Sequence, residues 1–271
     1  MSYSSQFRYA GDRYGAEVAH LKVGEDFNPE IGFLQREDFR RNYAFARFSP
    51  RPTQLRGVRR VRWEASLEDF ASVAGTPQTR AAVGAFQVFW DSGDQLSATY
   101  TWTDDRPQSA FHVAGAVIEP GVYRFGDTML RLALGSRWPL TGALSVSRGS
   151  FYGGNRTQFS ANGRVPVTSQ FLVEPDVRVN WLNFARANYI ASLVGVKASF
   201  TMTPRMSLAV FLQFNSTDHG LGTNVRFRWE YRPGSDFYAV YSDGRDTAFG
   251  SGFPTLLNRG FTVKFAHLLR L

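Results

Sequence analysis

The 271-residue chain contains no cysteine, which excludes a disulfide framework, a thiolate zinc site and a cysteine nucleophile. Long apolar runs are also missing, because no stretch approaches the roughly 18 to 20 consecutive apolar residues of a membrane-spanning helix. A helical membrane protein is therefore excluded. Lysine is rare as well, since Lys22, Lys197 and Lys264 are the only ones, and the formal net charge of +8 is carried almost entirely by arginine.

Helical periodicity is scarce, and Gly and Pro recur too often for long helices. A period of two recurs instead, and it is clearest between residues 224 and 232. There four apolar side chains alternate with four charged ones: Val225, Phe227, Trp229 and Tyr231 against Arg226, Arg228, Glu230 and Arg232. Successive side chains of a strand point to opposite faces, so this segment predicts a strand with one apolar and one charged face.

Alternation of this kind predicts a series of strands along the chain. They lie in two runs within 13–41 and at 58–73, 79–90, 96–103, 122–134, 140–148, 156–165, 176–184, 190–203, 206–215, 224–232, 236–242 and 261–270. Turn residues predict hairpin connections at 74–77, 91–94, 203–205, 232–235 and 242–244, and longer loops at 104–120 and 243–258. Sequential strands are therefore expected to pair as a meander.

Two all-β architectures fit this pattern, a soluble sandwich or barrel and a transmembrane barrel. The aromatic residues that end the apolar faces, the charges on the opposite faces and the unequal connections favour the membrane barrel. The number of strands also exceeds what a sandwich of this length needs. We predict an antiparallel up-and-down transmembrane β-barrel of roughly 12 to 16 strands, or the C-terminal part of a larger one.

Four segments carry a resemblance to a known family. They are Phe27 to Asp38 (FNPEIGFLQRED), Gln213 to Ser216 followed by Leu221 to Asn224, Arg226 to Asp236 (RFRWEYRPGSD) and Lys264 to Leu271 (KFAHLLRL). Together they resemble the C-terminal barrel domain, of unknown function, of bacterial outer-membrane proteins described as carbohydrate-binding-module-family-9-like. In that family a sugar-binding-like β-sandwich precedes the barrel. The resemblance runs from about Tyr3 to the end of the chain.

The resemblance implies that residues 1–271 form a single β-barrel domain that lacks the family's first barrel strands and its carbohydrate-binding-like domain. The first eight residues also lack the charged start, apolar middle and small-residue cleavage site of a secretory signal. We therefore expect the sequence to be a fragment or to have a truncated start.

The sequence offers little catalytic or metal-binding chemistry. Its four histidines, His20, His112, His219 and His267, are far apart and have no ligand spacing. No Gly-x-Ser-x-Gly elbow, phosphate loop or dinucleotide fingerprint occurs. Neighbouring acids such as 104–105, 25–26 and 37–38 are predicted to be solvated loop residues. We predict no catalytic residue, no metal and no cofactor.

Arginine is densest between Arg36 and Arg62, where aromatic residues are interleaved. Such a mixture can bind single-stranded nucleic acid, but no recognised module is present and no nucleic-acid partner is expected. The simpler interpretation is a row of lumen charges paired with Glu64 and other acids. The shared phase of Arg60, Arg62, Arg226 and Arg228 further suggests a basic lumen that concentrates anionic solutes or the acidic groups of a polysaccharide.

These observations predict a non-enzymatic protein of the bacterial outer membrane that acts as an anchor or conduit. Its expected partners are outer-membrane lipid and a poly- or oligosaccharide. One alternative is a barrel enzyme acting on surface lipid or glycan, with His112 and His219 as its best candidates. The other is a soluble β-fold binding module.

Overall fold

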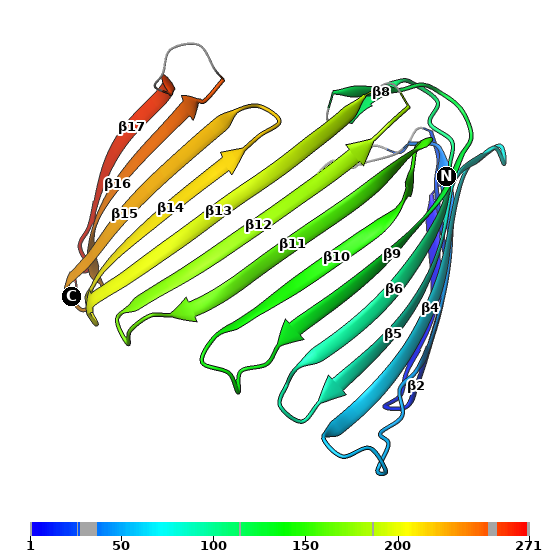
Figure 1. Cartoon of the computed structure of the whole chain (residues 1–271), viewed down its shortest axis with the longest axis horizontal. Helices are drawn as coiled ribbons and strands as arrows, with labels where there is room; N and C mark the ends of the chain where they lie inside the picture. Colours follow the sequence, from blue (N-terminus) through cyan, green and yellow to red (C-terminus); the bar gives the residue numbers. More distant parts are fainter. Residues whose placement is uncertain are drawn as a thin grey trace. The chain divides into compact units, whose positions relative to one another are not determined.

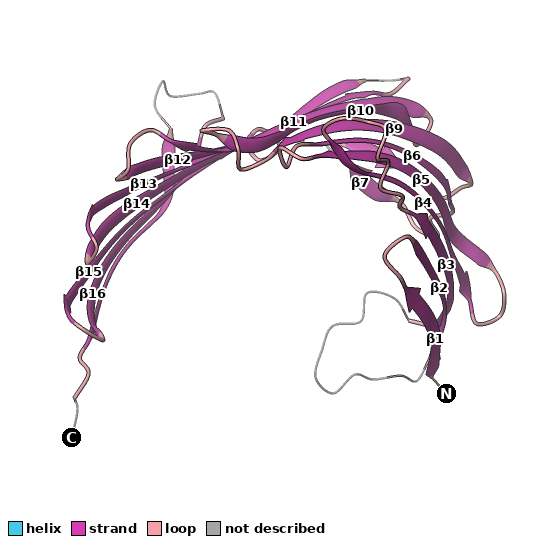
Figure 2. Ribbon diagram, turned by 90° about the horizontal axis from the view of Figure 1, so that it is seen from below, coloured by secondary structure: helices cyan, strands magenta, loops and turns pink. Residues whose placement is uncertain are grey.

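The structure is a computed structural model, and it describes residues 2–25, 27, 37–113, 115–185, 187–248 and 254–269. All regular elements of these residues are strands (Figure 2). Fifteen strands form one antiparallel sheet in which each strand pairs with its neighbour along the chain, and β7 pairs with β8 in a separate hairpin (Figure 1). In the described part of the chain, no helix is long and apolar enough to cross a membrane.

The strands of the sheet are β1 (Tyr3–Ala10), β2 (Tyr14–Val23), β3 (Phe39–Phe48), β4 (Val58–Ser72), β5 (Pro77–Trp90), β6 (Gln95–Asp105), β9 (Tyr123–Leu134), β10 (Thr141–Phe151), β11 (Gly154–Pro166), β12 (Phe171–Asn183), β13 (Asn188–Thr203), β14 (Met206–Asn215), β15 (Gly220–Arg232), β16 (Ser235–Asp246) and β17 (Thr255–Ala266). The hairpin strands are β7 (Phe111–Val113) and β8 (Ala116–Ile118). The predicted all-β, antiparallel, up-and-down arrangement is confirmed. The fifteen strands of the sheet fall within the predicted range of roughly 12 to 16.

Several details differ from the prediction. Most of β3 was not predicted, because residues 42–48 lie in none of the predicted strands, and the loop predicted at 243–258 is shorter, because residues 243–246 belong to β16 and residues 255–258 to β17. Strand β1 was not predicted, and the segment 104–120 contains the end of β6 and the hairpin β7–β8 rather than a plain loop. The turn predicted at 242–244 is wrong, because these residues lie inside β16. Gly244 there marks an irregularity of the strand, since the register with β17 shifts between Gly244 and Arg245.

The chain divides into two compact units. Unit 1 comprises Met1–Leu132, Val146–Thr157 and Leu182–Asn188, and unit 2 comprises Ala133–Ser145, Gln158–Trp181 and Tyr189–Leu271. In the described part of unit 1 the sheet strands β1 to β6 follow one another, and in unit 2 the strands β14 to β17 do so. Each unit is described below by itself.

In unit 1, the strand register aligns side chains of one kind into rows across β2 to β5. An aromatic row lies next to the connections 11–13 and 49–57 and consists of Tyr14, Phe48, Trp63 and Phe86. Its ring centroids are 5.3, 5.7 and 5.3 Å apart in this order. The next row on the same face is made of small residues, Ala16, Ala46, Ala65 and Gly84. A third row follows with Val18, Ala44, Leu67 and Ala82.

Beyond these three rows the same face of unit 1 becomes polar, with His20, Asn42, Asp69, Arg80 and Asp104 in register. Asp69 accepts a hydrogen bond from Arg80 over 2.9 Å. The apolar face is therefore a band, bounded by aromatic rings on one side and by charged groups on the other. Within the band large side chains remain exposed, such as Trp63 at 44% and Leu67 at 47%.

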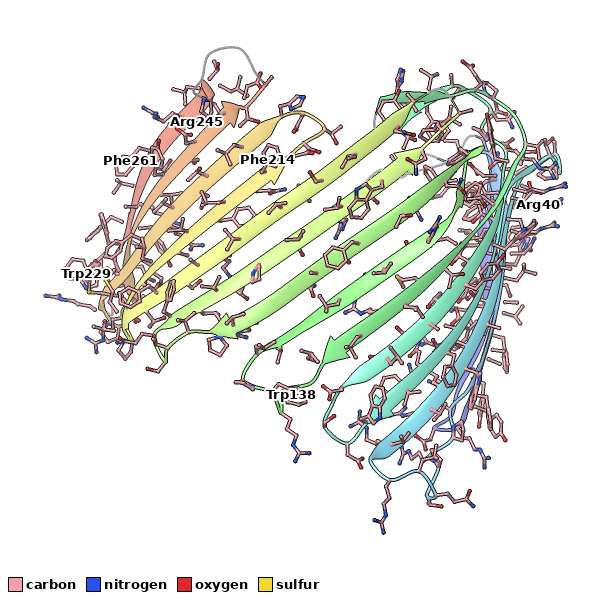
Figure 3. The ribbon with its side chains drawn as sticks, viewed as in Figure 1. Arg40, Trp138, Phe214, Trp229, Arg245 and Phe261 are labelled. Carbon is pink, nitrogen blue, oxygen red and sulfur yellow. The ribbon has the colours of Figure 1, made fainter. Side chains whose placement is uncertain are left out.

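Unit 2 repeats this order of rows on one face of β14 to β17. The aromatic row lies next to the turns 204–205 and 233–234 and consists of Trp229, Phe237 and Phe265, with Met206 in register on β14. The two apolar rows that follow are Leu208, Phe227, Ala239 and Val263, then Val210, Val225, Tyr241 and Phe261. The polar row contains Thr223, Asp243 and Arg259 on β15 to β17, while its position on β14 is occupied by Leu212. Figure 3 labels Trp229 at one end of β15 and Arg245 at the far end of β16.

Candidate functional site

The predicted arginines of unit 1 lie on the face opposite the apolar band. Arg60 and Arg62 alternate along β4 with Val61 and Trp63, as the sequence predicts. The guanidinium of Arg62 lies 3.5 Å from the carboxylate of Glu64 and 4.9 Å from the ring centroid of Phe89. Glu64 also accepts a hydrogen bond from Gln87 over 3.1 Å. The predicted ion pair with Glu64 is therefore present for Arg62.

Other charges on this face are also paired. On the neighbouring strand β3, Arg41 donates a hydrogen bond to Glu68 over 2.5 Å. The Nε atoms of Arg47, Arg60 and Arg62 are buried, and none of them has a hydrogen-bond acceptor among the described residues. The polar face of unit 1 thus carries ion pairs within and between strands and retains unused guanidinium donors. Of the basic segment 36–62, Arg36 lies outside the described residues.

The predicted arginines of unit 2 lie on β15, again opposite the apolar residues. Arg228 donates a hydrogen bond to Asp236 over 2.9 Å. Arg226 instead lies over the ring of Tyr238, 5.0 Å from its centroid. Two of the four predicted arginines, Arg60 and Arg62, therefore lie on the polar face of β4 in unit 1. The other two, Arg226 and Arg228, lie on the polar face of β15 in unit 2.

Arg226 lines a hollow of about 430 Å³ on this polar face. The other lining residues are Asn224, Tyr238, Val240, Thr262 and Lys264. Arg226 and Lys264 come from strands on either side of β16, and Lys264 lies two residues beyond Thr262, which is level with Arg226, so their backbones are about 12 Å apart. The nearby acid, Asp236, is already paired with Arg228. The hollow therefore combines two cations with an aromatic ring, a combination suited to an anionic group attached to a ring.

Sequence reasoning missed two aspartates that each hold two arginines. In unit 1 Asp104 accepts hydrogen bonds from Arg106 over 2.9 Å and from Arg124 over 3.0 Å. In unit 2 Asp243 accepts them from Arg245 over 2.6 Å and from Arg259 over 3.3 Å. The side chains of Asp104 and Asp243 are only 10% and 4% exposed.

The prediction that residues 104–105 are solvated loop acids is therefore wrong. Both belong to β6, where Asp104 binds the two arginines and Asp105 accepts a hydrogen bond from Tyr152 over 2.7 Å. The spacing Asp-x-Arg occurs at Asp104 and at Asp243, and it occurs also at Asp38 and Asp176, so the spacing alone does not identify the two clusters. The second arginine of each cluster, Arg124 or Arg259, comes from a neighbouring strand.

These contacts shift the pKa values of two groups that lie in connections between strands, Arg106 and Tyr152. The hydrogen bond to Asp104 raises the pKa of Arg106, which keeps this guanidinium charged. Burial, followed by the hydrogen bond to the Asp105 carboxylate, raises the pKa of the Tyr152 phenol. The ring of Tyr152 contacts Phe111 of β7 at 5.3 Å and Tyr123 at 5.2 Å between centroids. Tyr152 thus contacts both the β7–β8 hairpin, through Phe111, and the sheet of unit 1, through Tyr123.

The histidines occupy separate places. His112 lies in β7, His219 lies in the connection between β14 and β15, and His20 contacts Asn42 at 2.7 Å between Nδ1 and Oδ1. His267 contacts the hydroxyl of Tyr231 at 2.8 Å. Over the ranges that the structure describes, no group of three or more His, Asp or Glu side chains is arranged to hold a metal ion.

No protein-family model matches the chain. No curated protein matches it either. Among solved structures, the chain is similar to the ferric enterobactin receptor of Pseudomonas aeruginosa. A mutant in complex with enterobactin is 10% identical with a TM-score of 0.44, and a double mutant is 10% identical with a TM-score of 0.45. In both comparisons 90% of this chain is covered, and it spans 51% of the length of the receptor.

Proposed function

We propose that the chain is part of a bacterial outer-membrane β-barrel protein that serves as a membrane anchor or conduit. In this proposal the apolar bands of both units contact lipid, and the polar faces with Arg60, Arg62, Arg226 and Arg228 line a water-filled interior. The up-and-down meander pairs the backbone of each interior strand with both of its neighbours, and a membrane-spanning sheet also needs partners for its two edge strands, here β1 and β17.

The single observation that carries the proposal is the order of rows, which is the same in both units. An exposed apolar band lies between an aromatic row and a row of paired charges. Aromatic girdles flank the lipid-facing band of membrane barrels, and polar residues face the interior. A water-soluble sheet would cover such a face, because contiguous exposed apolar surface is unfavourable in water.

The solute that we propose for the conduit is an acidic poly- or oligosaccharide. The proposal of a carbohydrate rests on the family resemblance of the sequence. The proposal of acidic groups rests on the hollow with Arg226 and Lys264. A guanidinium and an ammonium bind carboxylates, and the guanidinium of Arg226 lies over the ring of Tyr238, which orients it at the hollow.

Flotation of the refolded chain with liposomes tests the membrane assignment, and planar-bilayer recording tests the conduit. We expect the chain to rise with the vesicles and to form pores that prefer anions. A chain that stays dispersed without detergent would contradict the membrane assignment and support the soluble binding module. Insertion without pores, or pores without anion preference, would restrict the function to that of an anchor.

A further inference from the structure

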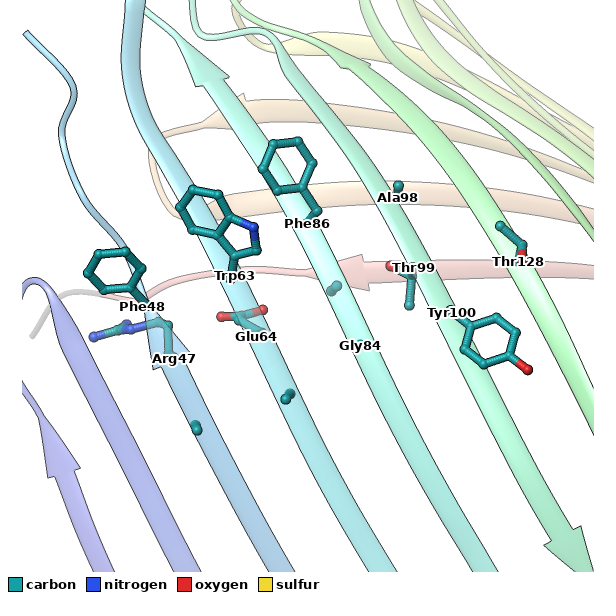
Figure 4. A pocket seen from close by; sticks show the side chains of 13 residues that line it. Arg47, Phe48, Trp63, Glu64, Gly84, Phe86, Ala98, Thr99, Tyr100 and Thr128 are labelled. Atoms are coloured by element: carbon teal, nitrogen blue, oxygen red, sulfur yellow. The ribbon is translucent and has the colours of Figure 1, made fainter.

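The apolar band of unit 1 contains a hollow of about 620 Å³ (Figure 4). Its floor is the row of small residues Ala46, Ala65 and Gly84, which we call the alanine-glycine furrow. Side chains of Phe48, Trp63, Phe86 and Tyr100 also line it. A Cβ atom built on Gly84 meets no atom within 4 Å, so the space above the floor is open at this position.

We propose that the alanine-glycine furrow binds one acyl chain of a membrane phospholipid. This inference rests on the proposed function, because it requires the apolar band to face lipid. The furrow would then be a specific lipid site within a band that otherwise contacts lipid in a general way.

The lining of the furrow favours a hydrocarbon occupant. Rows on one face of a strand are two residues apart, or about 7 Å, so the aromatic row and the row that contains Leu67 lie about 14 Å apart on either side of the floor. On this face of the strands the hollow is lined by Ala46, Ala65, Gly84 and aromatic rings, which offer no charged group to an occupant. An extended hydrocarbon chain needs no charged partner and matches this lining.

A cation lies at the aromatic edge of the band. The guanidinium of Arg13 lies 5.7 Å from the ring centroid of Tyr14 and 5.3 Å from that of Phe48. Arg13 belongs to the connection between β1 and β2, outside the apolar band. The nearby Asp12 carboxylate is paired with Arg51 over 2.7 Å. This geometry suits a phosphate held at Arg13 while an acyl chain lies against the rings and in the furrow.

Photocrosslinking with phosphatidylglycerol that carries a diazirine in one acyl chain tests the inference on the full chain in liposomes. We expect adducts to concentrate on peptides with Ala46, Ala65 and Gly84. Gly84→Leu fills the open space and should lower these adducts about fivefold, which corresponds to about 1 kcal/mol of binding free energy. If Gly84→Leu does not fold, Ala65→Leu makes the same test.

The matched control is Ala239→Leu, which adds the same bulk to the apolar band of unit 2. This variant should leave the adducts at the furrow unchanged. If the chain floats with the liposomes but the adducts are spread evenly over both apolar bands, the proposed lipid site at the furrow is wrong and the proposed function still holds. A disulfide between two protein copies through a single cysteine introduced at Ala65 would also overturn the lipid site, since the occupant would be a second copy. A chain that does not float would refute the proposed function and, with it, the furrow.

Discussion

The two units carry hollows on opposite faces of their strands. In unit 1 the hollow lies in the apolar band, above Ala65 and Gly84. In unit 2 it lies on the polar face, between Arg226 and Lys264. The alternation of polar and apolar residues is the same in both units, so it does not decide where a hollow forms. In unit 1 the strand register brings small side chains together between larger ones, whereas in unit 2 the hollow lies among long side chains such as Arg226 and Lys264.

The largest expected effect tests whether the two apolar bands are equivalent. Leu67→Arg in unit 1 and Leu208→Arg in unit 2 each place a charge in the middle of a band. Each should lower the free energy of unfolding by about 2 to 4 kcal/mol, measured by urea denaturation of the vesicle-embedded chain. Ser66→Arg on the polar face is the matched control and should have a small effect. A cost in only one unit would show that the other band does not face lipid.

A second effect compares the two aspartate clusters. Asp104→Asn and Asp243→Asn each remove the negative charge between two guanidinium groups, leaving the arginines to repel each other. Both changes should lower the midpoint of thermal unfolding by several degrees. Asp12→Asn, in the exposed pair with Arg51, should change it little. Equal effects of all three changes would contradict a special role for the Asp-x-Arg clusters.

A third, smaller effect concerns the polar hollow of unit 2. Arg226→Gln and Lys264→Gln should each weaken binding of glucuronate, measured by calorimetry, about threefold to tenfold, because each removes a charged hydrogen-bond donor. Arg228→Gln is the control, since Arg228 already donates to Asp236. A larger loss in Arg228→Gln than in Arg226→Gln would place the anion elsewhere on β15.

The smallest effect is a pH dependence found in unit 1. The pKa of Tyr152 is raised by burial and by the Asp105 carboxylate. The stabilisation by the neutral phenol is therefore fully present below the ordinary tyrosine pKa of about 10 and is lost as the pH rises above it. The difference in thermal midpoint between the chain and Tyr152→Phe should be constant from neutral pH to about 10 and should shrink above. A difference that already shrinks near pH 8 would refute this assignment.

Much of the fold was predictable from the sequence, because each strand of an antiparallel sheet with two different faces shows its own alternation. The segment 224–232 is an example, and β15 contains it entirely. Segment 242–244 misled the prediction because Ser-Asp-Gly is typical of turns. In the structure Asp243 is bound by Arg245 and Arg259, and these contacts stabilise the segment within β16.

The candidate sites were only partly predictable. Alternation placed Arg60, Arg62, Arg226 and Arg228 on polar faces, and the structure agrees. The partner of each arginine depends on the register between strands, which alternation within one strand does not determine. For the same reason the sequence did not reveal that Ala46, Ala65 and Gly84 form one row, since they come from three strands.

The central claim is that the apolar bands face lipid and the polar faces face water. Because the chain has no cysteine, single cysteines can be introduced at Ser66 and Leu67 in unit 1 and at Ala239 and Val240 in unit 2, and spin-labelled in liposomes. The account predicts that labels at Leu67 and Ala239 are accessible to oxygen dissolved in the lipid. Labels at Ser66 and Val240 should be accessible to a water-soluble nickel chelate. Access of the chelate to all four positions, or the reverse pattern, would contradict the account.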